Sequence, residues 1–174
     1  MKKVAVLMGS DSDLRVVESV FQTLERFGVP HEAHVYSAHR TPEEARDFAL
    51  QARLSGFGVI IAAAGMAAHL AGAIAANTTL PVIGIPINAG LFGIDALLST
   101  VQMPPGIPVA AVGVDNATNA ALLAVEILAV ADDALAARLD DMRAEMREKV
   151  LKKDRAVAAR FNARTDEGGE GMRT

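Results

Sequence analysis

Continuous apolar stretches alternate along the chain with stretches in which apolar residues recur every three or four positions. The continuous stretches predict strands buried on both faces of a parallel sheet, and the periodic stretches predict helices. Pro108 weakens the last predicted strand, because proline cannot donate a hydrogen bond within a sheet. The predicted strands are residues 3–8, 31–37, 59–63, 82–85 and 107–114, and the predicted helices are residues 14–27, 41–54, 66–76, 95–101 and 116–131.

This alternation predicts an α/β fold in which helices cover both faces of a parallel sheet through right-handed crossovers. In such sheets ligands bind beyond the carboxyl ends of the strands. Three loops that follow predicted strands fall at that edge, namely residues 9–13, 37–41 and 64–69. We therefore expect these three loops to form one shared site.

The rest of the chain is less regular. Residues 88–106 are punctuated by glycine and proline, and their length suits a lid or a subunit contact. Residues 116–131 are so apolar that we expect this helix to be buried all round. Residues 132–160 predict a charged helix whose narrow apolar stripe packs either on its own domain or on another subunit. One domain is expected over residues 1–164, followed by a disordered tail at residues 165–174.

Composition narrows the possible functions. A net charge of −4 and an aromatic content of 4% argue against a nucleic-acid surface. Cysteine is absent, and the four histidines lack the spacing of a helical metal site, so no metal is expected. Residues 59–76 are as long as a membrane span, but Gly65 and His69 interrupt them and no basic cluster flanks them. A buried strand and an alanine-rich helix explain this run better, and we expect a cytoplasmic protein without membrane contact.

Residues 37–42 read SAHRTP and join a predicted strand to a predicted helix. Thr41 and Glu44 are spaced as a capping box, which places His39 and Arg40 near the positive end of the helix. A titratable base, a fixed cation and free backbone amides suit a small anionic substrate. The alternative is an ordinary turn with exposed polar residues.

The other two loops also carry candidate chemistry. Residues 9–13 read GSDSD, whose hydroxyls and amides could receive a phosphate while Asp13 accepts bonds from sugar hydroxyls. The segment has neither the dinucleotide-binding nor the P-loop pattern, and simple helix capping explains it equally well. In residues 64–70, His69 alone is more often a core residue than a ligand, but the small side chains around it leave space for a pocket.

Two other classes share this architecture. A receiver domain would need a phosphoacceptor aspartate at the end of the third strand, where Ala62, Ala63 and Ala64 stand instead. A flavin-binding electron carrier would need aromatic side chains against the flavin, and Phe57 and Phe92 offer few candidates for that role. Both are therefore weaker interpretations than a small-molecule enzyme.

Four motifs together point to one family. They are MGSxSD from Met8, SAHRTP from Ser37, AGxAAHLxG from Ala64 and VQMPxGIPV from Val101. In this order and spacing they resemble the N5-carboxyaminoimidazole ribonucleotide mutase branch of the PurE family of purine biosynthesis. The resemblance extends from about Val4 to Leu128.

The resemblance implies a flavodoxin-like three-layer sandwich with a C-terminal helical extension, assembled as a homo-octamer. It implies interconversion of N5-carboxyaminoimidazole ribonucleotide and 4-carboxy-5-aminoimidazole ribonucleotide, a small-molecule reaction without cofactor or metal. A second branch of the family carboxylates aminoimidazole ribonucleotide directly with CO2 and is the alternative. Residues 67–70, which read AAHL, favour the mutase.

The resemblance also implies a role for each of eleven residues. His39 is implied as the general acid and base. Substrate binding is implied for Gly9 and Gly65 in their loops, Ser10, Ser12 and Arg40 at the phosphate, Asp13 at the ribose, Ser37 and His69 at the carboxylate, and Ala38 and Leu70 through backbone amides.

Several positions depart from the family pattern. Met66 stands where the family usually has glycine, Ala71 where it usually has proline, and residues 88–92 differ from the common serine- and alanine-rich version. These departures fall in the expected pocket wall and in the irregular loop, and they leave His39 and Arg40 untouched.

Overall fold

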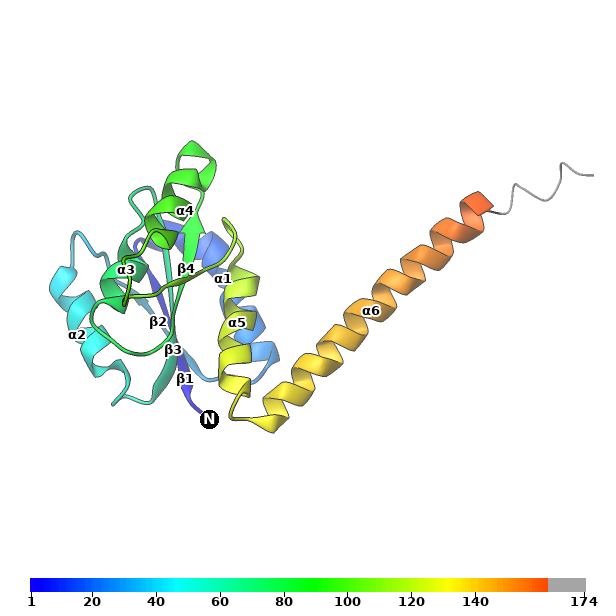
Figure 1. Cartoon of the computed structure of the whole chain (residues 1–174), viewed down its shortest axis with the longest axis horizontal. Coiled ribbons are helices and arrows are strands. Elements are labelled where there is room, and N and C mark those ends of the chain that lie inside the picture. The colour runs from blue at the N-terminus through cyan, green and yellow to red at the C-terminus, as the bar shows by residue number, and fades with distance from the viewer. Residues whose placement is uncertain (163–174) are drawn as a thin grey trace, which may run out of the picture. The chain divides into compact units, whose positions relative to one another are not determined.

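A computed structural model describes residues 1–162 of the chain (Figure 1). Its centre is one sheet of parallel strands in the order β2-β1-β3-β4-β5. This order, in which the first strand is flanked by the second and the third, confirms the predicted doubly wound α/β fold. The strands are β1 (Lys3–Met8), β2 (His31–Val35), β3 (Phe57–Gly65), β4 (Val82–Ile87) and β5 (Ala110–Ala111).

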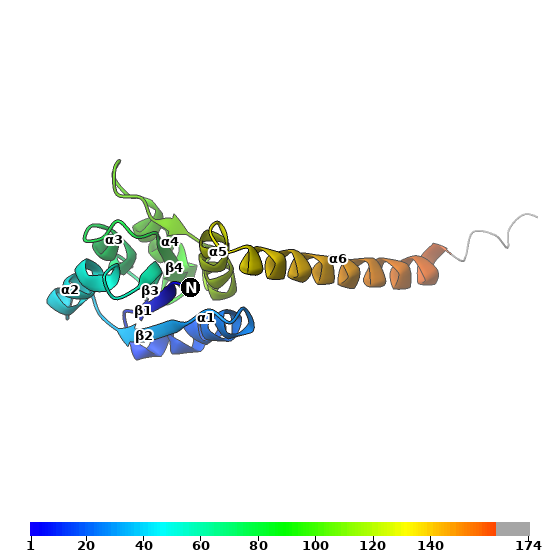
Figure 2. The ribbon, with the colours of Figure 1, turned by 90° about the horizontal axis from the view of Figure 1, so that it is seen from below.

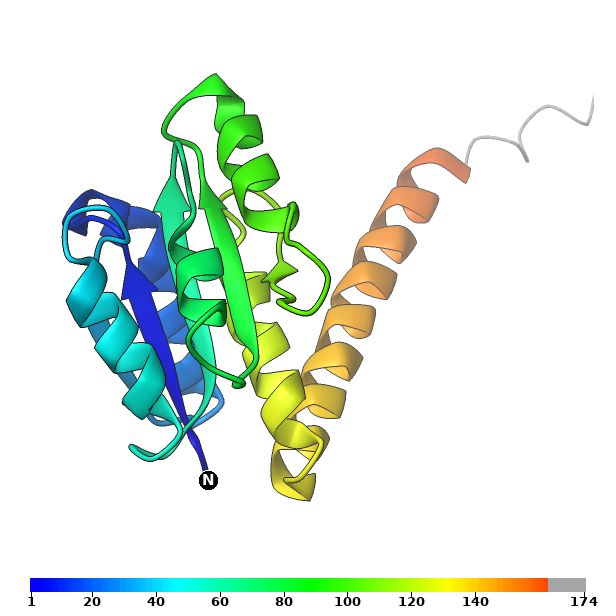
Figure 3. The same cartoon turned by 60° about the vertical axis from the view of Figure 1, so that its left-hand side comes forward.

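Helices cover both faces of this sheet (Figures 2 and 3). Helices α1 and α5 pack against each other on one face, and α2, α3 and α4 lie on the other. The result is the three-layer arrangement that the alternating pattern predicts. The helices are α1 (Leu14–Arg26), α2 (Pro42–Ala52), α3 (Leu70–Ala75), α4 (Ile94–Val101) and α5 (Ala117–Ala129), with short 3-10 turns η1 (Asp11–Asp13) and η2 (Leu91–Gly93).

Burial on both faces explains why the sequences of β1 and β3 are continuously apolar. Residues 4–8 of β1 and 59–63 of β3 are buried, because helices shield the sheet from both sides. In α1 only one side is buried, and its buried residues Val17, Val20 and Leu24 have helical spacing. Burial of these apolar side chains provides the main stabilisation of the fold.

The strand register aligns the carboxyl ends of the strands at one edge. Met8, the last residue of β1, pairs with Val35 of β2 and with Ala63 of β3. Gly65, the last residue of β3, pairs with Ile87 of β4. The loops that follow these four strands therefore begin side by side, which confirms the predicted convergence.

Two of the predicted elements are clearly shorter in the structure. The helix predicted at residues 66–76 begins only at Leu70, because Met66 adopts a left-handed backbone with φ 58° and the chain turns there. The strand predicted at residues 107–114 shrinks to the two residues of β5, consistent with proline at its start. The apolar run of residues 59–76 is nevertheless a strand followed by a helix, as expected.

Helix α5 corrects a further prediction, since it is not buried all round. Thr118 and Asn119 are exposed, and Leu122 and Leu123 are half-buried. Only the side facing the sheet and α1 is enclosed, and that side is lined by Ala117, Ala120, Ala121, Ala124 and Val125. The composition of the helix is more apolar than its environment in one chain requires.

The chain divides into two compact units, Met1–Leu135 and Ala136–Thr174. Helix α6 (Asp133–Phe161) is one continuous helix, which confirms the prediction for residues 132–160. That the sheet and this helix form one domain stays a prediction, and the predicted tail at residues 165–174 lies outside the described residues. Within residues 1–162, no helix has the combination of length and apolarity that crossing a membrane requires.

Candidate active site

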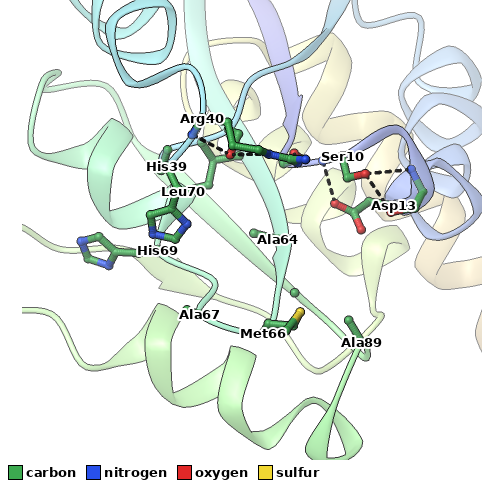
Figure 4. A pocket seen from close by; sticks show the side chains of 15 residues that line it. Ser10, Asp13, His39, Arg40, Ala64, Met66, Ala67, His69, Leu70 and Ala89 are labelled. Atoms are coloured by element: carbon green, nitrogen blue, oxygen red, sulfur yellow. Dashed lines mark hydrogen bonds between the residues drawn. The ribbon is translucent and has the colours of Figure 1, made fainter.

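A pocket of about 480 Å³ opens at the carboxyl edge of the sheet (Figure 4). All eleven residues that the sequence singled out line it, although they come from three separate loops. Four further residues, all small or apolar, complete the lining. The lining residues are Gly9, Ser10, Ser12, Asp13, Ser37, Ala38, His39, Arg40, Ala64, Gly65, Met66, Ala67, His69, Leu70 and Ala89.

The loop between β2 and α2 is closed on itself by hydrogen bonds. The Ser37 amide donates to Thr41 Oγ1 at 2.8 Å, and the Thr41 amide donates to the Ser37 carbonyl at 2.9 Å. Thr41 occupies the N-cap position, with Pro42 following it in the first helical turn, but its side chain caps no helix amide. The predicted capping box with Glu44 is therefore wrong, because Thr41 Oγ1 is already committed to Ser37.

Arg40 connects two of the three loops. Its guanidinium donates to the Gly9 carbonyl at 3.0 Å, across from the loop that follows β1. Its Nε also lies 3.4 Å from Ser37 Oγ, which in turn accepts the Arg40 amide at 3.2 Å. The two partners of the Arg40 side chain, the Gly9 carbonyl and the Ser37 hydroxyl, are neutral. The positive charge of Arg40 is therefore available to an anionic ligand.

His39 lies next to Arg40 in the same closed loop. Its side chain is exposed, and Figure 4 shows it on the side of the pocket where Arg40 and Leu70 lie. Because the loop is fixed at Ser37 and Thr41, the His39 backbone is held although its imidazole has space to move. An imidazole in this position can act as a general acid or base toward a bound molecule.

The loop after β1 uses its polar residues to build its own turn. Ser12 donates to Ser10 Oγ from its hydroxyl at 2.9 Å and from its amide at 3.3 Å. The Ser10 amide donates to Asp13 Oδ2 at 3.2 Å, which completes a capping box around η1. The capping interpretation of this loop is therefore confirmed, and the same residues also face the pocket.

Among residues 1–162, Asp13 is the one carboxylate that lines the pocket, and it is only 8% exposed. Burial raises the pKa of its carboxyl above the ordinary value, and the hydrogen bond from Ser10 offsets part of that effect. Nearby Asp11 raises the pKa further, whereas Arg15 lowers it. A partly desolvated carboxylate of this kind is an effective acceptor for ligand hydroxyl groups.

The opposite wall consists mainly of small residues at the end of β3 and in the segments that follow β3 and β4. An added Cβ on Gly65 would lie 2.7 Å from Cβ of Ala89, so only glycine allows these two segments to approach so closely. Met66 follows with a left-handed backbone, and Ala67 continues the wall. Apart from Met66, this wall presents almost no side-chain atoms to a ligand.

His69 occupies the N-cap position of α3, and its side chain rests on Gly72. An added Cβ on Gly72 would lie 2.5 Å from Cε1 and 2.9 Å from Nδ1 of the His69 ring. Figure 4 shows this ring directed away from His39, at the margin of the pocket. Gly72 thus makes room for the His69 imidazole, which gives the glycine of the AHLxG motif a physical reason.

Sequence reasoning missed Ala89 as a lining residue. An alanine carries no chemical signal, and only its place directly after β4 at the carboxyl edge could have indicated it. Among residues 1–162, no group of three or more His, Asp or Glu side chains is arranged to hold a metal ion.

Comparison with known proteins now identifies the family. The sequence model of the family described as AIR carboxylase matches residues 3–149. The chain belongs to this family. The family includes an N5-carboxyaminoimidazole ribonucleotide mutase of Methanocaldococcus jannaschii that is 49% identical over 91% of this chain and 99% of that protein. The mutase of the same name from Pyrococcus abyssi is 53% identical over 84% of this chain and 85% of that protein.

One further relative and one solved structure also resemble this chain. A protein of Vigna aconitifolia named phosphoribosylaminoimidazole carboxylase is 54% identical over 84% of this chain, which corresponds to 26% of that longer protein. The crystal structure of a variant of Treponema denticola PurE2 superimposes with a TM-score of 0.80, at 26% identity over 90% of this chain and 98% of the other. The family and the fold expected from the four motifs are both confirmed.

Proposed function

We propose that this enzyme is an N5-carboxyaminoimidazole ribonucleotide mutase, an isomerase of purine biosynthesis that forms 4-carboxy-5-aminoimidazole ribonucleotide reversibly. The observation that carries the proposal is a single pocket with two unlike sides. Arg40 and hydroxyl groups provide an anion site on one side, and small apolar residues provide a wall on the other. The shared name of close relatives that match almost end to end supports the same reaction.

The phosphate of the substrate is assigned to Ser10, Ser12 and Arg40. The two hydroxyls already lie 2.9 Å apart, and the Arg40 guanidinium reaches the same loop at the Gly9 carbonyl. A phosphate dianion gains charge-assisted hydrogen bonds from a guanidinium and ordinary ones from hydroxyls and amides. Asp13, at the end of the same loop, is assigned to the ribose hydroxyls.

The reaction moves a carboxylate from nitrogen to carbon on one molecule. The bond between the exocyclic nitrogen and the carboxyl carbon breaks, CO2 leaves without the electron pair, and the nitrogen takes up a proton. Ring carbon C4 then attacks CO2, a carbon–carbon bond forms, and C4 loses its proton. One proton is gained and one is lost, so a single residue can serve both steps.

His39 is assigned to that proton transfer. Histidine is the side chain whose unperturbed pKa suits both donation and acceptance near neutral pH. The other groups on its side of the pocket do not compete, since a guanidinium does not give up its proton in this range. Held between Ser37 and Thr41, His39 can face the ring while Arg40 holds the phosphate.

The apolar wall is assigned to keeping CO2 next to C4. Ala64, Gly65 and Ala67 present little polar surface, and Leu70 closes the wall with a side chain that is 2% exposed. A neutral, apolar molecule such as CO2 is retained by enclosure rather than by hydrogen bonds. Ser37 and His69 are assigned to the carboxylate, and the backbones near Ala38 and Leu70 to the imidazole ring.

The second candidate is direct carboxylation of aminoimidazole ribonucleotide with CO2, because two relatives of about 50% identity carry the carboxylase name. A turnover assay distinguishes the two reactions by supplying either N5-carboxyaminoimidazole ribonucleotide or aminoimidazole ribonucleotide with bicarbonate. The proposal expects much faster product formation from the first substrate. Faster product formation from aminoimidazole ribonucleotide with bicarbonate would make the enzyme a direct carboxylase. No product from either substrate would indicate a protein that binds a ligand without converting it.

We also propose that the enzyme is a homo-oligomer, and an octamer as the family resemblance implies. Leu91 and Phe92 of η2 are 75% and 87% exposed, and Ile94, Leu98 and Val101 form an exposed stripe at helical spacing along α4. A contiguous apolar surface of this kind usually contacts another protein surface. Light scattering tests this assembly, and a monomer at micromolar concentration would contradict it.

A further inference from the structure

Thr41 follows His39 and Arg40 in the SAHRTP motif, yet it is not among the described residues that line the pocket. It occupies the N-cap position of α2, where a threonine ordinarily accepts a hydrogen bond from an amide of the first helical turn. Here it caps no amide, although Glu44 stands where a capping box needs it. A side chain that departs from its usual local role is a candidate for a role in the site.

The Thr41 hydroxyl is bound instead to the backbone of Ser37. Its Oγ1 accepts the Ser37 amide at 2.8 Å and donates to the Ser37 carbonyl at 3.2 Å. The Thr41 amide donates to the same carbonyl at 2.9 Å. These three bonds join residues four positions apart, so they close the loop that contains His39 and Arg40. Branching at Cβ restricts Thr41 to few rotamers, which keeps its hydroxyl directed at Ser37.

His39 and Arg40 depend on this closed loop to different degrees. Arg40 has anchors of its own, because its guanidinium donates to the Gly9 carbonyl at 3.0 Å and its Nε lies 3.4 Å from Ser37 Oγ. Within residues 1–162 of one chain, the His39 imidazole makes no such hydrogen bond. The backbone of the loop is therefore what this chain supplies to place the imidazole.

We infer that Thr41 is a positioning residue for the acid–base histidine, and that its hydroxyl acts by closing the loop that places His39 against the reacting atoms. The inference rests on the proposed mutase function and adds to it a residue that does not touch the substrate. The reaction requires such control, because one imidazole has to serve both the exocyclic nitrogen and ring carbon C4. A displacement of about 1 Å in a reacting group can lower the rate roughly 10²-fold.

Two pairs of variants isolate the hydroxyl group. Thr41→Val is nearly isosteric but can neither accept the Ser37 amide nor donate to its carbonyl. We expect its kcat to fall roughly 10- to 100-fold while KM changes less than about three-fold, since Arg40 keeps its own anchors. Thr41→Ser should retain kcat within about three-fold of the wild type, because it keeps the hydroxyl. Thr41→Ala differs from Thr41→Ser only by the hydroxyl and should show the same loss as Thr41→Val.

Thr78 provides a matched control in the turn that precedes β4. Its Oγ1 accepts the Leu80 amide at 3.2 Å, so Thr78→Val also removes a hydrogen bond between a threonine hydroxyl and a backbone amide. Both valine variants should lower the unfolding temperature by a similar amount, about 1–4 °C. Only Thr41→Val should lower kcat for N5-carboxyaminoimidazole ribonucleotide, which separates positioning from a general loss of stability.

A double-mutant cycle shows whether Thr41 acts through His39. In the His39→Asn background, adding Thr41→Val should change the residual kcat less than about two-fold, because the group that Thr41 positions is gone. An equal loss in both backgrounds would overturn the inference, and so would wild-type kcat in Thr41→Val or a loss in Thr41→Ser as large as in Thr41→Ala. Failure of the proposed function looks different, because the wild type itself would then not convert the N5-carboxylated substrate.

Discussion

The two sides of the pocket are built in opposite ways. The loops after β1 and β2 are each closed by internal hydrogen bonds, from Ser10 to Asp13 in one and from Ser37 to Thr41 in the other. The Arg40 guanidinium ties the two loops together by donating to the Gly9 carbonyl. The loops after β3 and β4 have few side-chain atoms, and glycine and alanine set their close approach. The polar side is therefore organised to bind charge and move protons, whereas the apolar side is organised to enclose. Substitutions on the two sides should fail in different ways.

The largest effect is expected on the polar side, at the proton-transfer residue. His39→Asn keeps size and hydrogen bonding but cannot exchange protons near neutral pH, so kcat should fall by roughly 10²- to 10⁴-fold. Substrate binding, measured by isothermal titration, should stay within a few-fold of wild type. His31→Asn is the matched control, because His31 bonds the Val29 carbonyl away from the pocket and its replacement should leave kcat unchanged. Near-normal turnover by His39→Asn would assign the proton transfer to another group.

The next effect separates binding from chemistry on the same side. Arg40→Ala removes the charge-assisted bonds to the phosphate and should raise KM roughly 10- to 100-fold with a smaller change in kcat. Arg46 lies on α2, where its exposed side chain contacts only Asp47 at 3.7 Å among the ion pairs of the described chain. Arg46→Ala should therefore leave KM unchanged. A fall in kcat with unchanged KM in Arg40→Ala would place Arg40 at the reacting ring instead.

On the apolar side, Gly72→Ala tests whether the His69 ring takes its position because residue 72 has no side chain. The three atoms nearest to the added Cβ all belong to the His69 ring, so the ring must move. We expect kcat/KM to fall roughly 10-fold, within the range that small displacements of site groups produce. A double-mutant cycle provides the control, because Gly72→Ala should have no further effect once His69 is replaced by alanine. Equal effects in both backgrounds would show that Gly72 acts through the helix rather than through His69.

The smallest effect concerns Asp13, where binding and stability are expected to oppose each other. Asp13→Asn should weaken substrate binding roughly 3- to 10-fold, because an amide is a weaker acceptor for ribose hydroxyls than a carboxylate. The variant should also unfold at a slightly higher temperature at neutral pH, since burial disfavours the ionised carboxyl.

The pH dependence of that stability follows from the raised pKa of Asp13. A carboxyl whose pKa is raised by folding stabilises the folded state below the unfolded value of 3.8, and this contribution is lost as the pH rises through the folded pKa. The stability advantage of Asp13→Asn should therefore grow as the pH rises through that window and then stay constant. An advantage that is independent of pH in thermal unfolding would contradict this explanation.

Much of the polar side could be predicted from the sequence. His39 and Arg40 follow a strand and precede a helix, and loops in that position meet at the carboxyl edge of a parallel sheet. Ser10 and Asp13 were predictable for the same reason, although pattern alone could not separate capping from ligand binding. The structure shows that they cap the turn and line the pocket at once.

The apolar side was harder to predict, because small residues leave no pattern. Helix α3 was predicted four residues too early, since nothing in a methionine indicates the left-handed turn at Met66. Ala89 enters the pocket only because Gly65 allows β3 and the segment after β4 to approach each other. The bond from Ser37 to Thr41 was also hidden, because the competing cap on α2 fits the sequence equally well.

The fate of the carboxyl carbon in the wild-type enzyme tests the central claim most directly. Substrate labelled with ¹³C in its N5-carboxylate is converted in an excess of unlabelled bicarbonate, and the product is analysed by mass spectrometry. If one pocket binds the ribonucleotide through its polar side and encloses CO2 with its apolar side, nearly all of the product carries the label. Product in which the carboxyl group has exchanged with the unlabelled bicarbonate would contradict the account.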